Sequence, residues 1–296
     1  MGGTINRVTA LPAILISAFC ASLTQTPAVP PLRIGAPAAV VQPGSVFLLT
    51  ITGTERVPFV RARAFHRELT PFRNPRGAWQ VLVGVDLDVT PGTYPVEADG
   101  GIDGPVATRL LTVAPRRFLT RTLRVNPDLV NPPASAMERI AQEANRLRRL
   151  WDAPATDRAW TGPFLRPVPD TANSSFGTRS IYNGEPRAPH GGTDFASPAG
   201  RPIKAPNAGR VALAGSLYFT GGTVVIDHGG GVLSMFAHLS IVAVAEGDEV
   251  KAGDLIGEVG ATGRVTGPHL HWAVRVNGAR VDPLLLLSAL RGAPVP

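Results

Sequence analysis

Short apolar runs separated by turn residues dominate the first third of the chain. Four such runs are predicted as strands: residues 46–51, 79–85, 93–96 and 108–113. Pro-Gly pairs, such as Pro43-Gly44 and Pro91-Gly92, separate the runs as expected for strands joined by tight turns. Short strands at this spacing predict an immunoglobulin-like β-sandwich over residues 32–115. His66 is the one histidine of this segment and is predicted to be a surface or structural residue.

In the linking segment, residues 116–160, the apolar residues are spaced farther apart than in a strand. Apolar side chains recur there three and four residues apart, at Met137, Ile140, Ala141, Ala144, Leu147 and Leu150. This spacing predicts one amphipathic helix over residues 135–151. Ser135 is followed by Glu138 three residues later, which is the arrangement of a capping box, so Ser135 is predicted to be the helix N-cap.

The remaining segment, residues 161–290, alternates β-type runs with glycine turns. Its predicted strands are residues 211–214, 223–227, 232–237, 255–259 and 270–276. Glycines at 221–222 and 229–231 turn the chain back between them. Residues 284–290 are predicted as a short apolar helix. The chain is therefore predicted to be mainly β, with an N-terminal sandwich, one linking helix and a C-terminal sheet.

The first 26 residues have the pattern of a secretory signal peptide. Arg7 precedes an apolar run over residues 11–21, which is too short to span a bilayer. An uncleaved N-terminal anchor is the alternative interpretation. Cys20 is the sole cysteine, and Phe19 before it argues against a lipoprotein, which needs a small residue there. The mature chain is therefore predicted to be exported, with no stable membrane span after signal removal.

The chain is basic, with 29 Lys and Arg, 22 Asp and Glu and a formal net charge of +7 over 296 residues. Positive charge draws a protein towards anionic polymers and membrane surfaces. A genome composition that favours arginine codons explains the same excess equally well. The basic residues are scattered and form no recognition pattern, so no nucleic-acid partner is predicted.

Five of the six histidines lie between residues 190 and 271, and this stretch carries the candidate chemistry. It opens with His190-Gly191-Gly192-Thr193-Asp194, where the glycines let the chain bend and bring imidazole and carboxylate together. It closes with His269-Leu270-His271, whose two imidazoles share one face if the segment is a strand. Imidazoles and a carboxylate, with a fourth position left to water, are ligands of a catalytic zinc ion. His190, Asp194 and either closing histidine would complete such a set, although an isolated H-x-H is more often a coincidence.

Several motifs between residues 176 and 287 together resemble the M23 family of zinc metallopeptidases, the lysostaphin- or LytM-type enzymes. The segments that carry the resemblance are Phe176-Gly177-Thr178-Arg179, residues 190–198, Val224-Val225-Ile226-Asp227-His228-Gly229, Phe236-Ala237-His238-Leu239-Ser240, residues 247–253, Gly260-Ala261-Thr262-Gly263, His269-Leu270-His271 and Val281-Asp282-Pro283. Phe236 departs from the family, which more often has tyrosine there, but no ligand is lost.

The resemblance implies a function and a role for each site residue. Members of this family cut peptide cross-links of bacterial peptidoglycan, so a zinc metalloendopeptidase with an M23-type antiparallel sheet or barrel-sandwich domain over residues 161–290 is expected. It implies that His190, Asp194 and His271 bind Zn²⁺, and that His238 and His269 are the catalytic residues. Peptidoglycan is the implied partner and the periplasm or the cell exterior the implied location. The N-terminal sandwich is assigned to binding, spacing or shielding of the peptidase.

Two other functions fit parts of the sequence. Degenerate family members bind wall peptides or activate an amidase, but they usually lack one or more of the five positions that are all present here. A lipoyl- or biotinyl-type carrier has turn glycines like those of residues 246–254, yet carriers need no H-x-x-x-D and place a lysine at a hairpin apex. His228, beside a glycine turn, is predicted to brace a loop.

Overall fold

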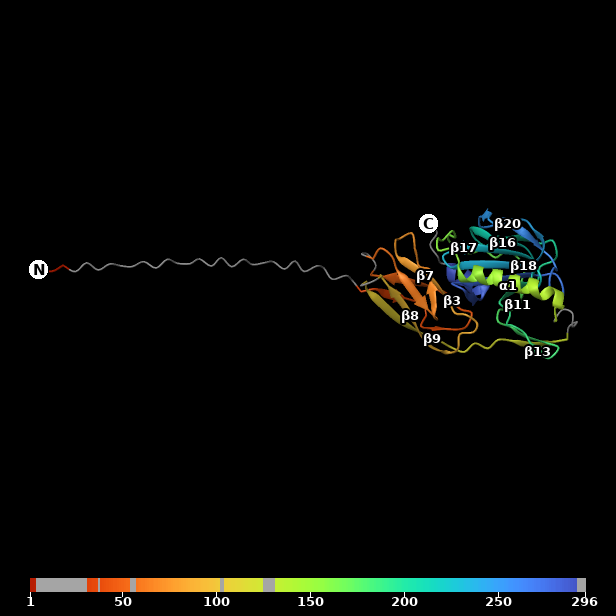
Figure 1. The fold of residues 1–296 in the computed structure, drawn as a ribbon, viewed down its shortest axis with the longest axis horizontal. Helices are drawn as coiled ribbons and strands as arrows, with labels where there is room; N and C mark the ends of the chain where they lie inside the picture. The colour runs from red at the N-terminus through yellow and green to blue at the C-terminus, as the bar shows by residue number, and fades with distance from the viewer. Residues whose placement is uncertain (4–30, 37, 54–56, 102–103, 125–130, 292–296) are drawn as a thin grey trace.

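The computed structural model describes residues 1–3, 31–36, 38–53, 57–101, 104–124 and 131–291. Apart from its first three residues, the predicted signal peptide lies outside the described residues. Figure 1 shows two β-rich bodies side by side, the orange strands of the N-terminal part and the green to blue strands of the C-terminal part. The mainly β fold class is confirmed. The domain limits expected at residues 115 and 160 stay predictions.

The N-terminal part has two sheets. One has the order β1(Arg33–Gly35), β3(Val46–Thr52), β7(Trp79–Gly84), β6(Phe72–Arg73), and the other β2(Val40–Val41), β9(Val106–Val113), β8(Gly92–Asp99), β4(Arg61–Ala64), β5(Arg67–Leu69). Alternate apolar side chains of the two sheets form one buried cluster, which includes Leu49, Val81, Val96 and Leu111. The four predicted strands are confirmed, and the immunoglobulin type of the sandwich stays a prediction.

The C-terminal part is built on one long sheet. Its order is β11(Ala172–Ser174), β14(Gly192–Phe195), β21(Leu270–Val276), β18(Val232–Val242), β17(Gly221–Gly229), β16(Gly209–Leu217), β19(Glu249–Val250). Three strands pair off this path: β15(Pro202–Lys204) with β20(Leu255–Val259), β20 also with β18, and β22(Ala279–Val281) with β21. A separate small sheet holds β10(Thr120–Leu123), β12(Arg179–Tyr182) and β13(Glu185–Pro186). All five strands predicted for this part are confirmed.

The linking helix α1(Met137–Asp152) lies across the C-terminal sheet (Figure 1). Leu147, Leu150 and Trp151 pack against buried side chains of β16, β17 and β18. The helix is confirmed, but the prediction of Ser135 as its N-cap is wrong. A 3₁₀ turn, η2(Ala134–Ala136), precedes the helix, and no side chain caps either element. This turn takes over the role of a cap, because the Ala136 N–H donates to the Pro133 carbonyl at 2.9 Å.

The last helix, α2(Pro283–Leu290), is the predicted apolar one. Asp282 caps it, since its Oδ1 accepts from the Leu284 N–H at 3.1 Å, and Pro283 stands at the first turn, where it loses no helical hydrogen bond. None of the helices in the described ranges has the length and apolar character needed to cross a membrane.

The turn between β21 and β22 joins the two parts of the chain. Asn277 Nδ2 donates to the Leu82 carbonyl at 2.9 Å, and Asn277 Oδ1 accepts from the Thr70 N–H at 3.1 Å. Gly84 permits the close approach, because a Cβ there would lie 2.8 Å from Val281 Cγ1. Leu82 also belongs to the apolar cluster of the C-terminal sheet, so the two parts share buried packing.

A buried ion pair lies at the same junction. Asp86, with a side chain 8% exposed, accepts from the Arg280 N–H at 2.8 Å and pairs with the Arg280 guanidinium. Asp88 contacts the same guanidinium, but its side chain is 77% exposed. Burial alone would raise the pKa of Asp86, yet the hydrogen bonds and charge of Arg280 outweigh it and hold that pKa below its usual range.

Asp86→Asn is expected to destabilise the protein by about 3 kcal/mol near neutral pH, because Arg280 loses its buried counter-charge. Asp88→Asn is the matched control and should cost less than about 1 kcal/mol, since an exposed pair is screened by solvent. The folded pKa of Asp86 is lowered, so its contribution is present above the unfolded pKa of ~3.9 and is lost as the pH falls below that value. Urea unfolding of the three proteins measures this, and equal losses in both variants near neutral pH would contradict it.

Candidate metal centre

Strand pairing places two of the predicted site residues opposite each other. β14 runs antiparallel to β21 with Asp194 paired to His271, and β18 pairs on the other side with Ala237 opposite His271. Directly paired residues on antiparallel strands project from the same face. Gly192 leaves room for the imidazole, because a Cβ there would lie 2.8 Å from His271 Cε1. The glycine of the H-x-x-x-D motif is therefore required by packing against the H-x-H strand.

His190, Asp194 and His271 converge on one point. His190 Nε2 lies 2.9 Å from Asp194 Oδ1 and 3.0 Å from His271 Nδ1, and His271 Nδ1 lies 2.8 Å from Asp194 Oδ1. One ligand atom from each residue lies within 4.8 Å of the other two, which makes them a group that could hold a metal ion. The side chains of all three are about 15% exposed, so the group is sheltered but reachable from solvent.

A backbone contact holds the second ring nitrogen of His190, Nδ1. Its Nδ1 lies 3.1 Å from the Ser175 carbonyl, which can only accept, so Nδ1 carries the hydrogen and donates. Nε2 is then the ring nitrogen that faces Asp194 and His271. A hydrogen bond from the second nitrogen of this kind orients metal-ligating histidines and raises their basicity.

His238 and His269 lie beside this group and are held in the same way. His238 Nδ1 donates to the Thr262 carbonyl at 2.9 Å, and His269 Nδ1 donates to the Gly267 carbonyl at 2.9 Å. Their ring centroids are 4.8 Å apart, and His269 Nε2 lies 4.0 Å from Asp194 Oδ1. Nε2 is thus the ring nitrogen that remains available on each side chain. His269 and His271 both reach Asp194, so the prediction that they share one face is confirmed.

The backbone of His238 is strained. Its φ is +70°, a left-handed conformation that costs a non-glycine residue roughly 1 kcal/mol or more. The conformation is anchored, because the His238 N–H donates to the Thr220 carbonyl at 2.8 Å. Such strain persists where surrounding contacts over-determine the position, and here it aims the ring at His269 and His271.

Burial and charge set the protonation states of the site. Burial would raise the pKa of Asp194, but hydrogen bonds from His190 and His271 outweigh it and hold that pKa far below its ordinary range. Burial lowers the pKa of His238 to about 4, and it also lowers that of His271. At neutral pH the site therefore combines an ionised carboxylate with a neutral His238.

His228 lies apart from this group, as predicted. It is fully buried, with Nδ1 2.8 Å from the Ala208 carbonyl and Nε2 3.0 Å from Ser234 Oγ, and its ring meets the edge of Phe164 at 4.9 Å. Because the carbonyl can only accept, Nδ1 donates and Nε2 accepts from the serine hydroxyl. The residue braces the turn between β17 and β18.

The contacts that orient the histidines are the part that sequence reasoning missed. Ser175, Thr262 and Gly267 act through main-chain carbonyls, and such acceptors are independent of side-chain identity. One usable signal was present, because Thr262 lies in the Gly-Ala-Thr-Gly motif. Its Oγ1 accepts from the Gly222 N–H and donates to the Leu239 carbonyl, both at 2.8 Å, which pins the loop to β17 and β18.

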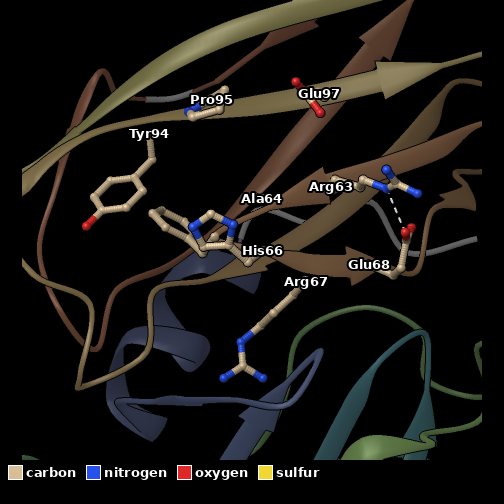
Figure 2. A pocket seen from close by; sticks show the side chains of 9 residues that line it. Arg63, Ala64, His66, Arg67, Glu68, Tyr94, Pro95 and Glu97 are labelled. Atoms are coloured by element: carbon tan, nitrogen blue, oxygen red, sulfur yellow. Dashed lines mark hydrogen bonds and ion pairs between the residues drawn. The ribbon is translucent and has the colours of Figure 1, made fainter.

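A hollow of about 400 Å³ lies far along the chain from these histidines, on the N-terminal sandwich (Figure 2). His66 lines it from the turn between β4 and β5, next to Tyr94 of β8, and is exposed as predicted. Arg63 and Glu68 at its rim pair with each other at 2.6 Å. None of the five predicted site residues lines this hollow, so it is separate from the candidate metal centre.

Comparisons with known proteins cover the segment that carries this site. Residues 188–283 match peptidase family M23. A crystal structure of a Pseudomonas aeruginosa protein assigned to peptidase M23 is 34% identical, covers 85% of this chain and 96% of its own, and superposes with a TM-score of 0.68. A sheltered His-Asp-His group on an antiparallel sheet is the kind of site that a metallopeptidase needs. The chain belongs to peptidase family M23.

Curated relatives match the same region. The DD-carboxypeptidase/endopeptidase Mpg of Neisseria meningitidis serogroup B is 45% identical over 95 residues, which are 32% of this chain and 22% of the relative. The peptidoglycan DD-endopeptidase ShyA of Vibrio cholerae is 41% identical over 113 residues, 38% of this chain and 26% of the relative. The match thus spans about a quarter of the length of these relatives.

His228 is expected to stay neutral in the folded protein until the pH approaches 4, because complete burial lowers its pKa to about 4. Nitrogen-15 shifts of the imidazole should show the Nδ1–H tautomer near neutral pH. The unfolded protein in urea is the control and should titrate near ~6.5. Since the unfolded state takes up this proton first, the residue lowers stability as the pH falls from ~6.5 towards 4. A folded-state midpoint above ~6 would contradict the assignment.

Proposed function

We propose that this chain is a zinc-dependent endopeptidase that hydrolyses peptide cross-links of bacterial peptidoglycan. The observation that carries the proposal is the convergence of His190, Asp194 and His271 within 4.8 Å, with the neutral His238 beside them. The names of the relatives support the substrate, since ShyA is a peptidoglycan DD-endopeptidase.

The donor set fits zinc. Two imidazole nitrogens and one carboxylate oxygen are borderline-to-hard ligands, and three protein ligands are typical of a catalytic zinc site that keeps a position open. His190 Nε2, an Asp194 carboxylate oxygen and His271 Nδ1 would hold the ion, since these atoms face one another. When bound, zinc would lower the pKa of a water molecule towards neutrality and polarise the scissile carbonyl.

The chain's own residues then handle the proton. His238 is neutral at working pH, and its Nδ1–H is engaged by the Thr262 carbonyl, so Nε2 can accept a proton from the attacking water. His269 is held the same way by the Gly267 carbonyl, so its Nε2 can accept or relay that proton. Asp194 stays ionised through this cycle because its two histidine partners stabilise the carboxylate.

A non-catalytic wall-binding protein or amidase activator is the alternative. All five positions are present, and the two groups of side chains lie in contact distance, with His238 and His271 ring centroids 6.1 Å apart. A protein that only binds wall peptides has no need of a neutral His238 and a second histidine beside a metal-binding group. The geometry therefore favours hydrolysis.

Replacing the two groups of residues should separate metal binding from catalysis. His190→Ala, Asp194→Ala and His271→Ala should each lose zinc, because two remaining protein ligands hold the ion poorly. His238→Ala and His269→Ala should keep zinc and lose on the order of a hundredfold or more in turnover, because a proton relay is gone. Zinc content by atomic absorption and release of new peptide termini from purified peptidoglycan measure the two effects.

His228→Ala is the control for loss of a buried histidine outside the site, and it should keep both zinc and most of the activity of its folded fraction. Zinc loss in His269→Ala with retention in His271→Ala would exchange the two roles. A fully active His238→Ala would remove that residue from the mechanism. Wild-type protein that binds zinc but releases no termini would support the non-catalytic alternative.

We also propose that the mature protein acts in the cell envelope, in the periplasm or outside the cell. The substrate lies there, and the N-terminal apolar run has the pattern of a secretory signal. Sequencing the N-terminus of mature protein from fractionated cells should find a start between about residues 21 and 30. Recovery from the cytoplasm alone, with Met1 intact, would refute this location.

A further inference from the structure

The loop between β20 and β21 carries an arginine that packs on an aromatic ring. Arg264 is exposed, and its guanidinium carbon lies 4.4 Å from the centroid of the Phe219 ring. Its backbone N–H donates to the Phe219 carbonyl at 2.8 Å, so both main chain and side chain are fixed to the turn between β16 and β17. These two contacts therefore restrict the conformations that the Arg264 side chain can adopt.

Among the described residues, Arg264 forms no ion pair, and no carboxylate contributes to its electrostatic surroundings. Other arginines do have such partners, for example Arg146 with Glu246 at 2.6 Å. The near groups are instead Tyr182, Tyr218 and the like-charged Arg187. Burial lowers the pKa of Arg264, and the charge of Arg187 acts in the same direction. A guanidinium without a counter-ion gains from any anion that arrives.

The backbone of this arginine lies close to a contact that orients one of the site histidines. Thr262, two residues earlier, is the residue whose carbonyl holds His238 Nδ1 at 2.9 Å. Two extended residues span at most about 7 Å, so the Arg264 backbone is within that distance of the contact that orients His238. Arg187 lies three residues before His190 in the chain, and its Nε is buried without a hydrogen-bond partner among the described residues. Its Nη2 pairs with Glu185 at 2.6 Å.

We propose that the Arg264 guanidinium binds a substrate carboxylate next to the scissile bond, with Arg187 adding positive potential behind it. This inference rests on the proposed function and names a residue that recognises the cross-link. In a direct link from D-alanine to a diamino diacid, the carbon attached to the scissile nitrogen carries a free carboxylate. A glycine bridge offers no charge at that position. Planar guanidinium groups bind carboxylates through two parallel hydrogen bonds, which gives both affinity and orientation.

Kinetics on a matched pair of substrates test the proposal. One is a cross-linked peptide dimer with the free carboxylate, and the other is the same dimer with that carboxylate converted to a carboxamide. Arg264→Gln should raise KM for the carboxylate substrate on the order of 10- to 100-fold, because a charge-assisted hydrogen bond is lost. It should leave the carboxamide substrate nearly unchanged. Arg264→Lys should recover part of the loss, since it keeps the charge without the planar fork.

Arg73→Gln is the matched control. Arg73 is also exposed and lies 4.5 Å over an aromatic ring, that of Trp79, but on the N-terminal sandwich. This variant should leave KM for both substrates unchanged. Zinc content and thermal unfolding of Arg264→Gln should match those of the wild type, which excludes a misfolded site. An equal loss on both substrates, or no loss on either, overturns the proposal.

A binding measurement separates this proposal from the function on which it rests. Calorimetry with the product tripeptide, which ends in the diamino diacid and has no scissile bond, needs no turnover. Wild type should bind the carboxylate form more tightly than the carboxamide form, and Arg264→Gln should abolish that difference. If wild type cleaves neither dimer, the proposed function fails while this measurement still decides the arginine's role. Equal affinity of wild type for both tripeptides overturns it.

Discussion

The register between β14 and β21 is the constraint on which the site depends. With Asp194 directly opposite His271, both side chains leave the same face, and His190 at the entrance to β14 closes the group. Side chains alternate faces along a strand, so a slip of one residue would turn Asp194 to the opposite side. Buried apolar residues on both sides of these positions, Phe195 and Trp272 among them, hold the register. The apolar pattern of the sheet thus fixes the polar geometry.

Hydrogen bonds from the histidine rings to backbone carbonyls determine which ring nitrogen of each histidine faces the site. Carbonyls of Ser175, Thr262 and Gly267 take the Nδ1–H of three imidazoles, which leaves their Nε2 atoms free. Two of these histidines differ in surroundings: Nε2 of His190 lies against Asp194, whereas His238 is farther from the carboxylate and kept neutral by burial. Backbone acceptors and burial therefore give similar residues different surroundings, as the proposed division into metal-binding and proton-accepting residues requires.

The larger strands and both helices could be predicted from the sequence. Apolar residues recur at every second position in the strands and at every third or fourth position in the helices. The H-x-x-x-D and H-x-H motifs were visible for a similar reason, since a sharp glycine bend and a strand each place their side chains together. Spacing alone left His269 and His271 interchangeable. Separating them took the resemblance, and the distances to Asp194, 4.0 and 2.8 Å, are consistent with that separation.

Other features could not be predicted, because they depend on partners far apart in the chain. The Asp86–Arg280 pair joins residues 194 positions apart, and neither position has a local signature. Ser135 had the local pattern of a cap, but the 3₁₀ turn after Pro133 supplied the hydrogen bond first. The orienting carbonyls of the site and the stacking of Arg264 on Phe219 are equally invisible to local patterns, since both follow from tertiary contacts.

A crystal of the zinc-loaded protein, measured on both sides of the zinc absorption edge, tests the central claim most directly. An anomalous peak bounded by His190 Nε2, Asp194 and His271 Nδ1, with His238 and His269 outside coordination distance, is the result expected from the ligand geometry. A peak coordinated by His238 or His269, or no zinc among these residues, would contradict the division of the five positions into ligands and catalysts.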